Sequence, residues 1–385
     1  RITEQIEKEV LSQIGGEDYI GCGIDSNFTL GLFKMTWMKR HLLQDVDQPF
    51  YFLPVSDYFS FRLTGEAVWS YSQACRSYCF DIHTRTWNEN TTRITGVREH
   101  LPPVHPSGHR LHKRYGDASV YLGGHDHILG MYGIDSLFRE EAYFYSMGSA
   151  SVLGGFTSIA KNHMEHLMEN SPGMTIGVSH SINRYYVENS LRYFGKLHDA
   201  VSHWYHAESP KQFYDDVNDF VEKLQPEHEI PFFLVEGDRL NKEQTTGINM
   251  MNLSVQTDQK HVVYGLYVYL GLMSKIILDE VAAFEDKPNI VAGGGIVKNP
   301  PLIQFIADII GKPIHILNQQ ELTALGAALT AAEENGDQET IEHLRAKVET
   351  SLVEPSSNAE IRQKQAAGMK KAIENMLCKL TNNNN

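Results

Sequence analysis

An acidic side chain directly after a pair of glycines is the first feature of this sequence that could carry out a reaction. The segment from Tyr121 to Gly133 reads YLGGHDHILGMYG, which predicts a short strand over 118–122, a glycine turn and a helix whose first turn holds Asp126. The positive end of a helix favours an ionised carboxylate. Such a group beside an open glycine turn can orient a hydroxyl and accept its proton during phosphoryl transfer. Asp126 is therefore a candidate general base, and simple capping of the helix is the alternative.

Two histidines, His125 and His127, flank this carboxylate and raise the question of a metal site. Residues two apart point to different sides of a helix. No further His, Asp or Glu set at ligand spacing lies nearby in the sequence. We therefore predict no metal ligands here, and a metal-dependent hydrolase centred on His125, Asp126 and His127 is the weaker alternative.

A hydroxyl-rich turn follows between two apolar, strand-like stretches. Residues 146–151 read SMGSAS. Main-chain amides in such a turn, together with a serine hydroxyl, can cradle a phosphate group. Gly148, Ser149 and Ala150 are therefore candidate phosphate-binding residues, although an ordinary hairpin loop explains the pattern equally well.

The segment IVAGGGIVKNPPLIQFIADIIG, residues 290–311, predicts a strand, a triple glycine at 293–295 and a helix. Asn299 suits the N-cap, Pro300 the first helical position and Gly311 the residue after the helix. A helix that starts beside glycines at the end of a strand forms a corner that can hold a nucleotide. The sequence matches neither the G-x-G-x-x-G fingerprint nor the Walker loop, so a tight turn without a ligand is the alternative.

The elements that must position these residues alternate between strands and helices. Strand-like stretches at 232–235, 289–292 and 313–317 alternate with helical patterns at 260–284, 300–310 and 322–334, which predicts an α/β sheet. The 385 residues suffice for two domains, with a boundary near 135–140. In the first half, the aromatic stretch 50–61 predicts a helix packed under a loop. From 337 we expect a charged helical tail whose last residues, 382–385, are disordered.

Composition excludes several other classes of protein. The net charge is −14 and the 34 basic residues are scattered, which argues against binding to nucleic acid or anionic lipid. The four cysteines are few and irregularly spaced, as expected of reduced thiols in a cytoplasmic protein. No run approaches the roughly 20 apolar residues of a membrane span, and the first 20 residues show no export signal. We expect no membrane partner.

Taken in order, these motifs resemble the FGGY family of carbohydrate kinases. The resemblance rests on Gly123-Gly124-His125-Asp126, Gly148-Ser149-Ala150, Gly293-Gly294-Gly295 through Asn299, and the later TALGAA of 323–328. Upstream, KMTWMK at 34–39, DYFSFRLTG at 57–65 and SQACRSYCFD at 72–81 with Trp87 also resemble family segments. The resemblance extends from about residue 1 to residue 335.

This resemblance implies two actin-like, ribonuclease-H-like domains with a cleft between them. The expected boundaries are 1–136 for the sugar-binding domain, 137–336 for the ATP-binding domain and 337–385 for the helical tail. The implied cofactors are ATP and Mg²⁺, the substrate is a small sugar, polyol or aldonate, and a homodimer is possible. By position, the implied base is Asp126, the substrate-binding residues are His127, Asp57 and Tyr58, and the nucleotide-binding residues are Gly148, Ser149, Ala150, Gly293, Gly294, Gly295 and Asn299.

One departure from the family pattern bears on these expectations. The family's early strand with a D-x-G-T turn is absent from this sequence, so we expect the first domain to be incomplete at its N-terminus and a preceding segment to supply that turn. The acceptor pocket is expected to use loops at 70–77, 188–195 and 236–239, which do not identify the sugar. An actin-like nucleotide-binding protein without transfer activity is the alternative function.

Overall fold

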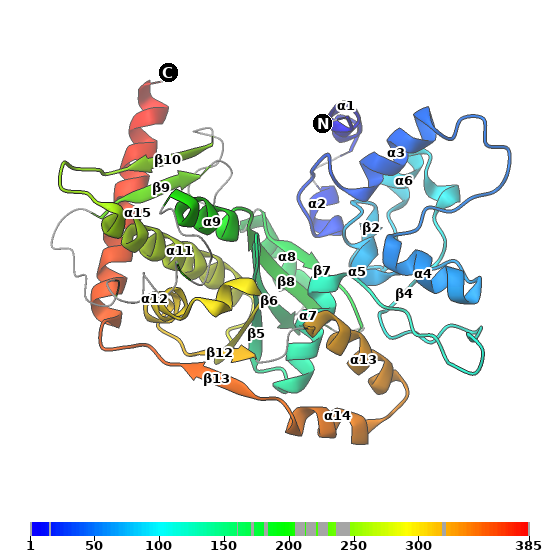
Figure 1. Cartoon of the computed structure of the whole chain (residues 1–385). Helices are drawn as coiled ribbons and strands as arrows, with labels where there is room; N and C mark the ends of the chain where they lie inside the picture. The colour runs from blue at the N-terminus through cyan, green and yellow to red at the C-terminus, as the bar shows by residue number, and fades with distance from the viewer. Residues whose placement is uncertain are drawn as a thin grey trace.

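A seven-stranded mixed sheet forms the centre of the larger lobe of the protein (Figure 1). This computed structural model describes residues 2–14, 17–159, 161–170, 173–180, 184–204, 212, 221, 230–235, 247–317 and 321–383. The strand order across the sheet is β13-β12-β11-β5-β6-β8-β7. The strands are β5 (Ala142–Met147), β6 (Ser151–Thr157), β7 (Thr175–Gly177), β8 (Tyr185–Leu191), β11 (Asn289–Gly293), β12 (Ile314–Leu317) and β13 (Thr350–Val353).

The pairing directions in this sheet follow the ribonuclease-H-like pattern. β5, β11 and β12 run parallel to one another, whereas β6 and β8 continue from β5 as antiparallel neighbours. The central strands are covered on both faces, and every residue of β6 is buried. Strands buried on both faces read as continuous apolar runs in sequence. The predicted α/β sheet is therefore confirmed.

Helices cover both faces of the sheet (Figure 1). One layer holds α7 and α13, which pack against each other, and α7 also contacts β5 and β6. The other layer holds α11 and α12, and α11 contacts β6 and β8. Their bounds are α7 (Asp126–Leu137), α11 (Gln259–Ala282), α12 (Pro300–Ile310) and α13 (Leu322–Glu334).

Close packing of α7 on α13 depends on a glycine in the TALGAA segment. A Cβ added to Gly326 would lie 1.8 Å from the carbonyl oxygen of Leu129, far inside van der Waals contact. The Cβ of a residue at Gly133 would lie 3.3 Å from the backbone of Gly326. Small residues therefore let the two helix backbones approach, and this packing fixes the start of α7 where Asp126 lies.

The C-terminal segment is an integral part of the larger lobe. β13 pairs antiparallel with β12, and α15 (Ala359–Asn383) packs on α11 and α12 after α14 (Gln338–Ala346). The strand corrects the expectation of a purely helical tail: its residues are exposed or half-buried at the sheet edge, so they lack a buried apolar face that sequence reasoning could detect. α15 continues through Asn383, so 382–383 are helical rather than disordered, and 384–385 lie outside the described residues.

The smaller lobe is built mainly from short helices around buried aromatic side chains. Within its described residues, the strands form two two-stranded sheets, β1 with β4 and β2 with β3. Trp69 and Trp87 pack edge to face, and their indole N–H groups donate to the carbonyls of Phe52 and Pro102. The elements are α1 (Glu4–Leu11), α2 (Glu17–Cys22), α3 (Gly31–His41), α4 (Val55–Thr64), β1 (Trp69–Ser70), α5 (Tyr71–Ala74), β2 (Phe80–Asp81), β3 (Thr86–Trp87), α6 (Glu89–Thr95) and β4 (Val104–His105).

Two local expectations in this lobe were wrong. Residues 118–122 form no strand, only isolated bridges from Ala118 to Tyr115 and from Tyr121 to Arg110. The aromatic helix α4 is a surface helix, because Val55 and Phe59 are 74% and 64% exposed. Aromatic content alone gave no information about which face of the helix would be covered.

Among the residues that the structure describes, one helix is long and apolar enough to cross a membrane by length and composition. This helix is α11, with a mean hydropathy of 1.4 over its most apolar window. Of that window, 78% is buried inside the protein. A helix at the centre of a protein core passes the same test of length and composition, and α11 lies against both the sheet and α12.

Candidate active site

The two glycine turns lie side by side at the carboxyl ends of β5 and β11. Gly293 of β11 pairs with Ser146 of β5. Gly294 has a φ of 108°, and a Cβ on it would lie 2.4 Å from the carbonyl oxygen of Met147. No side chain fits there, so the turn after β11 can touch the turn after β5 only through glycine. In open α/β sheets, ligands bind in the crevice outside the carboxyl ends of parallel strands.

The turn between β5 and β6 is held by the start of α9 (Phe194–Trp204). The backbone N–H groups of Gly195 and Lys196 donate hydrogen bonds to the carbonyl oxygen of Ser149 at 3.1 and 3.2 Å. Within the turn, the N–H group of Gly148 donates to the carbonyl oxygen of Ala150 at 3.1 Å. These bonds fix the turn, while Ser149 and Ala150 remain exposed. Gly295 adds open space, because a Cβ there would meet nothing within 4 Å. The corner therefore offers ordered backbone and a hydroxyl to a ligand.

Asn299 is the N-cap of the helix that follows the glycines 293–295, and its expected contact with a nucleotide stays a prediction. Its side chain is fully buried and accepts a hydrogen bond from Leu302 N–H as the N-cap of α12. Its amide nitrogen lies 2.7 Å from the hydroxyl of Tyr267 and 3.1 Å from Nε2 of His198. These contacts order the start of α12 next to the glycine corner.

Asp126 begins α7, and its side chain is 66% exposed. Its Oδ1 accepts a hydrogen bond from His127 N–H at 2.8 Å and lies 3.1 Å from Nδ1 of His125. Burial raises the pKa of Asp126, but the imidazoles of His125 and His127 and the guanidinium of Arg76 outweigh burial and hold that pKa below its ordinary value. An exposed, ionised carboxylate at a helix start is the state that a general base requires.

The start of α7 and the glycine corner meet through Leu322, the first residue of α13. A Cβ on Gly293 would lie 2.9 Å from Leu322 Cδ1, and one on Gly130 of α7 would lie 3.8 Å from Leu322 Cβ. In addition, Thr323 donates a hydrogen bond to the carbonyl of Asp126 at 3.2 Å. Asp126 and the two glycine turns therefore belong to one contiguous region at the edge of the sheet.

The smaller lobe contributes the segment around α5, which lies beneath the glycine turn before Asp126. Ser72 Oγ accepts a hydrogen bond from His125 N–H at 2.9 Å. A Cβ on Gly124 would lie 2.4 Å from Ser72 Oγ and 2.7 Å from Ser107 Oγ, so only glycine fits between them. This contact places the start of α5 against the residues that precede α7 at the candidate base.

Asp57 and Tyr58 are not brought to Asp126. Asp57 is fully buried and accepts hydrogen bonds from the backbone and hydroxyl of Ser70, so it holds the segment that carries Ser72. Burial raises the pKa of Asp57 to about 6, although these hydrogen bonds oppose the rise. Tyr58 lies on the exposed face of α4, where its hydroxyl accepts from Arg62. The expected contact of these two residues with substrate stays a prediction.

Sequence reasoning did not single out the ion pair between Arg76 and Glu188, which lies beside the candidate base. Arg76 Nη2 donates to Glu188 Oε1 across the two lobes. Burial, together with the Arg76 guanidinium, lowers the pKa of His125 to about 4. The loops 70–77 and 188–195 were expected to line the acceptor pocket, but sequence spacing could not show that two residues 112 apart would meet. The third expected loop, 236–239, lies outside the described residues.

The side chains around Asp126 do not form a metal site of their own among the described residues. Among the described residues, no three His, Cys, Asp or Glu side chains are arranged to hold a metal ion, so the hydrolase alternative has no geometric support. Mg²⁺ rarely uses an all-protein cage and is usually bound through one or two carboxylates together with substrate phosphates. Asp126 lies at the same edge of the sheet as the glycine turns, so its carboxylate could bind Mg²⁺ together with the phosphates of a bound nucleotide.

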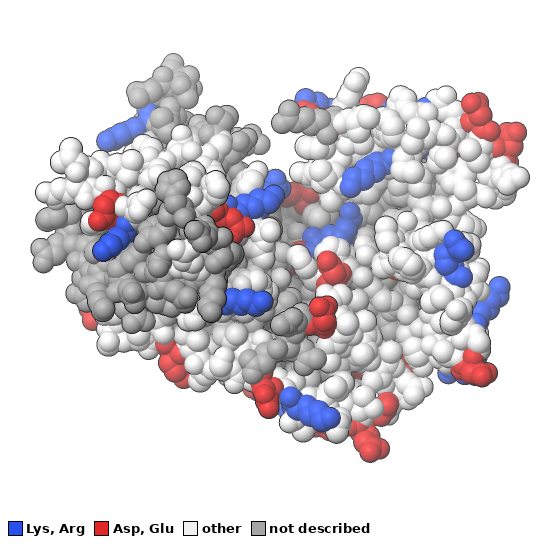
Figure 2. All heavy atoms as spheres, in the orientation of Figure 1, with Lys and Arg blue, Asp and Glu red and all other residues white. Residues whose placement is uncertain are grey.

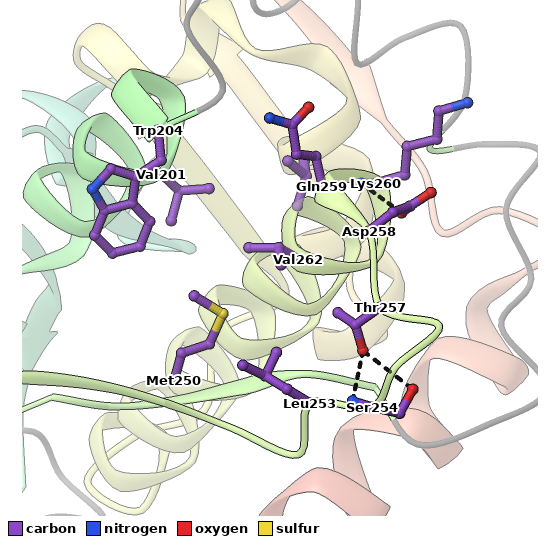
Figure 3. A pocket seen from close by; sticks show the side chains of 11 residues that line it. Val201, Trp204, Met250, Leu253, Ser254, Thr257, Asp258, Gln259, Lys260 and Val262 are labelled. Carbon is purple, nitrogen blue, oxygen red and sulfur yellow. Dashed lines mark hydrogen bonds between the residues drawn. The ribbon is translucent and has the colours of Figure 1, made fainter.

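On the face shown in Figure 2, the molecule is hollowed between its lobes, and basic and acidic side chains both border the hollow. A separate cavity of about 710 Å³ lies further along α9, between its last turn, β10 (Ile248–Met251) and the start of α11 (Figure 3). Val201, Trp204 and Met250 form its apolar side. This cavity is distinct from the residues around Asp126.

Comparison with known proteins gives consistent results. Residues 2–129 match the N-terminal domain of the FGGY family of carbohydrate kinases, and residues 146–333 match the C-terminal domain. A glycerol kinase of Thermococcus gammatolerans is 24% identical over 97% of this chain and 76% of its own length. A glycerol kinase of Bacillus velezensis is 24% identical over 72% of this chain and 57% of its own length. Several of the curated relatives are thus matched over less than two thirds of their length.

Solved structures share the fold at lower sequence identity. The xylulose kinase of Rhodospirillum rubrum superposes with a TM-score of 0.83 at 17% identity, over 98% of this chain and 79% of that protein. The ADP complex of Plasmodium falciparum glycerol kinase superposes with a TM-score of 0.81 at 18% identity, over 97% of this chain and 77% of that protein. The gluconate kinase of Lactobacillus acidophilus superposes with a TM-score of 0.77 at 16% identity, over 99% of this chain and 77% of that protein. These relatives act on different acceptors, so the fold alone does not select one.

Proposed function

Because the chain belongs to the FGGY family of carbohydrate kinases, we propose that it transfers the terminal phosphate of ATP to a hydroxyl of a small sugar, polyol or aldonate. The observation that carries this proposal is the placement of Asp126. It is an exposed carboxylate whose pKa is held low, and it lies at the same sheet edge as two glycine turns. A base and a phosphate-binding corner within one region are the parts that phosphoryl transfer requires.

In the proposed reaction, Asp126 accepts the proton of the acceptor hydroxyl as that oxygen attacks phosphorus. His127 N–H and the start of α7 hold the carboxylate ionised before the transfer. Gly148, Ser149, Ala150 and the glycines 293–295 would hold the nucleotide at the corner. ATP supplies the phosphoryl group, and Mg²⁺ neutralises the charge on its phosphates.

We propose that the smaller lobe binds the acceptor and the larger lobe binds ATP. The predicted domain boundary at 136 stays a prediction, and α7, whose last turn includes that position, packs in the larger lobe on α13, β5 and β6. His127 follows Asp126 and is half-buried, and its ring centroid lies 5.6 Å from that of His125. Its role in acceptor recognition stays a prediction. A homodimer and a cytoplasmic location stay predictions.

The test is release of ADP that depends on an added acceptor. Polyols, ketoses and aldonates of three to six carbons are supplied one at a time with ATP and Mg²⁺, and ADP is measured. At least one acceptor should raise ADP release well above the rate without acceptor. Tight nucleotide binding with no acceptor-dependent ADP would instead support the alternative, a nucleotide-binding protein without transfer activity.

A further inference from the structure

The ion pair between Arg76 and Glu188 joins the two lobes beside the proposed base. Arg76 follows α5 in the smaller lobe, and Glu188 lies on β8 of the central sheet. Only 5% of the Glu188 side chain and 21% of the Arg76 side chain are exposed. The charge of Arg76 acts on both His125 and Asp126, and that of Glu188 acts on His125. The pair therefore lies within electrostatic reach of the atoms that would handle the acceptor.

The pair meets through a single contact, which leaves one donor and one acceptor unused. Arginine and carboxylate side chains frequently meet through two parallel N–H···O bonds. Here Arg76 Nε and Glu188 Oε2 are both buried and have no hydrogen-bond partner in the part of the chain that the structure describes. Buried polar groups are nearly always paired. An unpaired donor and acceptor on two partnered side chains therefore point to a ligand that supplies both functions.

A hydroxyl group supplies both functions, because it donates one hydrogen bond and accepts others. Neighbouring hydroxyls of a polyol could donate to Glu188 Oε2 and accept from Arg76 Nε–H while another hydroxyl faces Asp126. A carboxylate can only accept hydrogen bonds, so it cannot pair with Glu188 Oε2, and the charge of Arg76 is already neutralised by Glu188. Glu188 neutralises Arg76, and like charges brought together at a binding site cost several kcal/mol. An acidic acceptor would thus meet repulsion from both Glu188 and Asp126.

We propose that Arg76 and Glu188 bind hydroxyls of the acceptor and select an uncharged polyol or sugar over an aldonate. The inference rests on the proposed kinase function and narrows its acceptor class. It assigns a role in specificity to two residues that otherwise only join the lobes.

The experiment compares acceptors in pairs of equal carbon number: glycerol with glycerate, xylitol with xylonate, and sorbitol with gluconate. Binding of each compound to the ADP-loaded protein is measured by calorimetry, and turnover by ADP release. The unsubstituted protein should prefer the neutral member of the best-bound pair by at least tenfold in both affinity and kcat/KM. Equal or better binding of the acid would overturn the proposal.

The variant Glu188→Gln removes the negative charge and leaves Arg76 without its counter-charge. It should weaken binding of the neutral acceptor and improve binding of the acid, so that the preference between them falls at least tenfold. A purely structural pair would weaken both members equally and leave the preference unchanged, which would also overturn the proposal. Glu360→Gln, at a side chain that is 79% exposed, is the matched control and should change nothing.

A second variant and a second readout keep the test decisive. If Glu188→Gln does not fold, the variant Arg76→Lys replaces it, because lysine keeps the charge but lacks the Nε donor. Arg76→Lys should weaken the binding of neutral acceptors at least tenfold, while the preference for neutral over acidic acceptors persists. Unchanged binding of neutral acceptors in that variant would count against the role of Arg76. Preferential binding of neutral acceptors without any ADP release would refute the kinase function while supporting the binding role of the pair.

Discussion

The hydroxyl of Thr323 donates a hydrogen bond of 3.2 Å to the carbonyl oxygen of Asp126, which ties the first turn of α13 to the first turn of α7. The two residues are 197 positions apart in the chain. Leu322, next to Thr323, also contacts the glycine turn after β11. The position of the proposed base therefore depends on the same helix start that closes the nucleotide corner.

Asp126→Asn should lower kcat by about 10²-fold or more, the scale of losing a positioned acid–base group. Nucleotide affinity should stay within a few fold, because the side chain lies on the acceptor side of the corner. Since the pKa of Asp126 is held below its ordinary value, the acid limb of the kcat profile should lie below the ordinary range of aspartate. Steady-state ADP release measures the fall in kcat, and between pH 4 and 9 the unsubstituted protein should show no acid limb from Asp126.

The control for this variant is Asp45→Asn, an exposed aspartate in the smaller lobe. It should leave kcat and the pH profile unchanged. Unaltered turnover in Asp126→Asn would show that another group accepts the proton.

Gly294→Val should weaken ATP binding more than acceptor binding. Its φ of 108° is strained for any residue with a Cβ, and that Cβ would lie 2.4 Å from the Met147 carbonyl. Gly295→Ala is the matched variant, because its Cβ would meet no protein atom within 4 Å. It should keep the melting temperature and change only nucleotide affinity. An equal loss of affinity for ATP and for the acceptor in Gly294→Val, measured by calorimetry, would indicate misfolding instead.

Gly326→Ala should destabilise the protein by about 1–3 kcal/mol, the usual cost of overpacking. The added Cβ would lie 1.8 Å from the Leu129 carbonyl, so α13 must move away from α7. Gly368→Ala in α15 is the control, because its Cβ meets nothing within 4 Å, and it should stabilise by about 0.5–1 kcal/mol. Urea unfolding of both variants provides the comparison. Equal stability of the two would contradict the close helix packing.

Arg362→Leu should destabilise the protein by about 3–5 kcal/mol, because it leaves a buried carboxylate without its counter-charge. Arg362 Nη1 donates to Asp308 Oδ2 at 2.6 Å, and both side chains are buried. Lys364→Ala, in an exposed pair with Glu360, should cost less than about 1 kcal/mol. Denaturant unfolding distinguishes the two, and a small effect of Arg362→Leu would mean that α15 is not anchored by this pair.

Asp57→Asn should change how stability depends on pH. Burial raises the pKa of Asp57 to about 6 in the folded protein, above its ordinary 3.8. A raised carboxyl pKa stabilises the folded state below pH 4, and this contribution is lost as pH rises through 6. Relative to the original protein, the variant should therefore gain about 2–3 kcal/mol between pH 4 and pH 7. A pH-independent difference in unfolding free energy would show that the carboxyl titrates normally.

The sequence by itself determined the elements whose patterns are local. The helix from Pro300 was predicted because Asn299 and Gly311 mark its two ends, and both are observed as its caps. The turn at Gly148 was likewise predicted, since glycines at strand ends reflect local backbone geometry. The parallel strand β11 was visible as an apolar run between turn residues.

Only the tertiary structure decided which distant residues meet and which side chains face inward. Asp57 and Asn299 were placed among the ligand-binding residues from motif position, yet both are buried and hydrogen-bonded within the protein. Arg76 and Glu188, in contrast, form a pair that no spacing in the sequence predicts. The reason is physical: caps and turns depend on a few neighbouring residues, whereas burial and ion pairing depend on how the two lobes pack, which is set by contacts over more than a hundred positions.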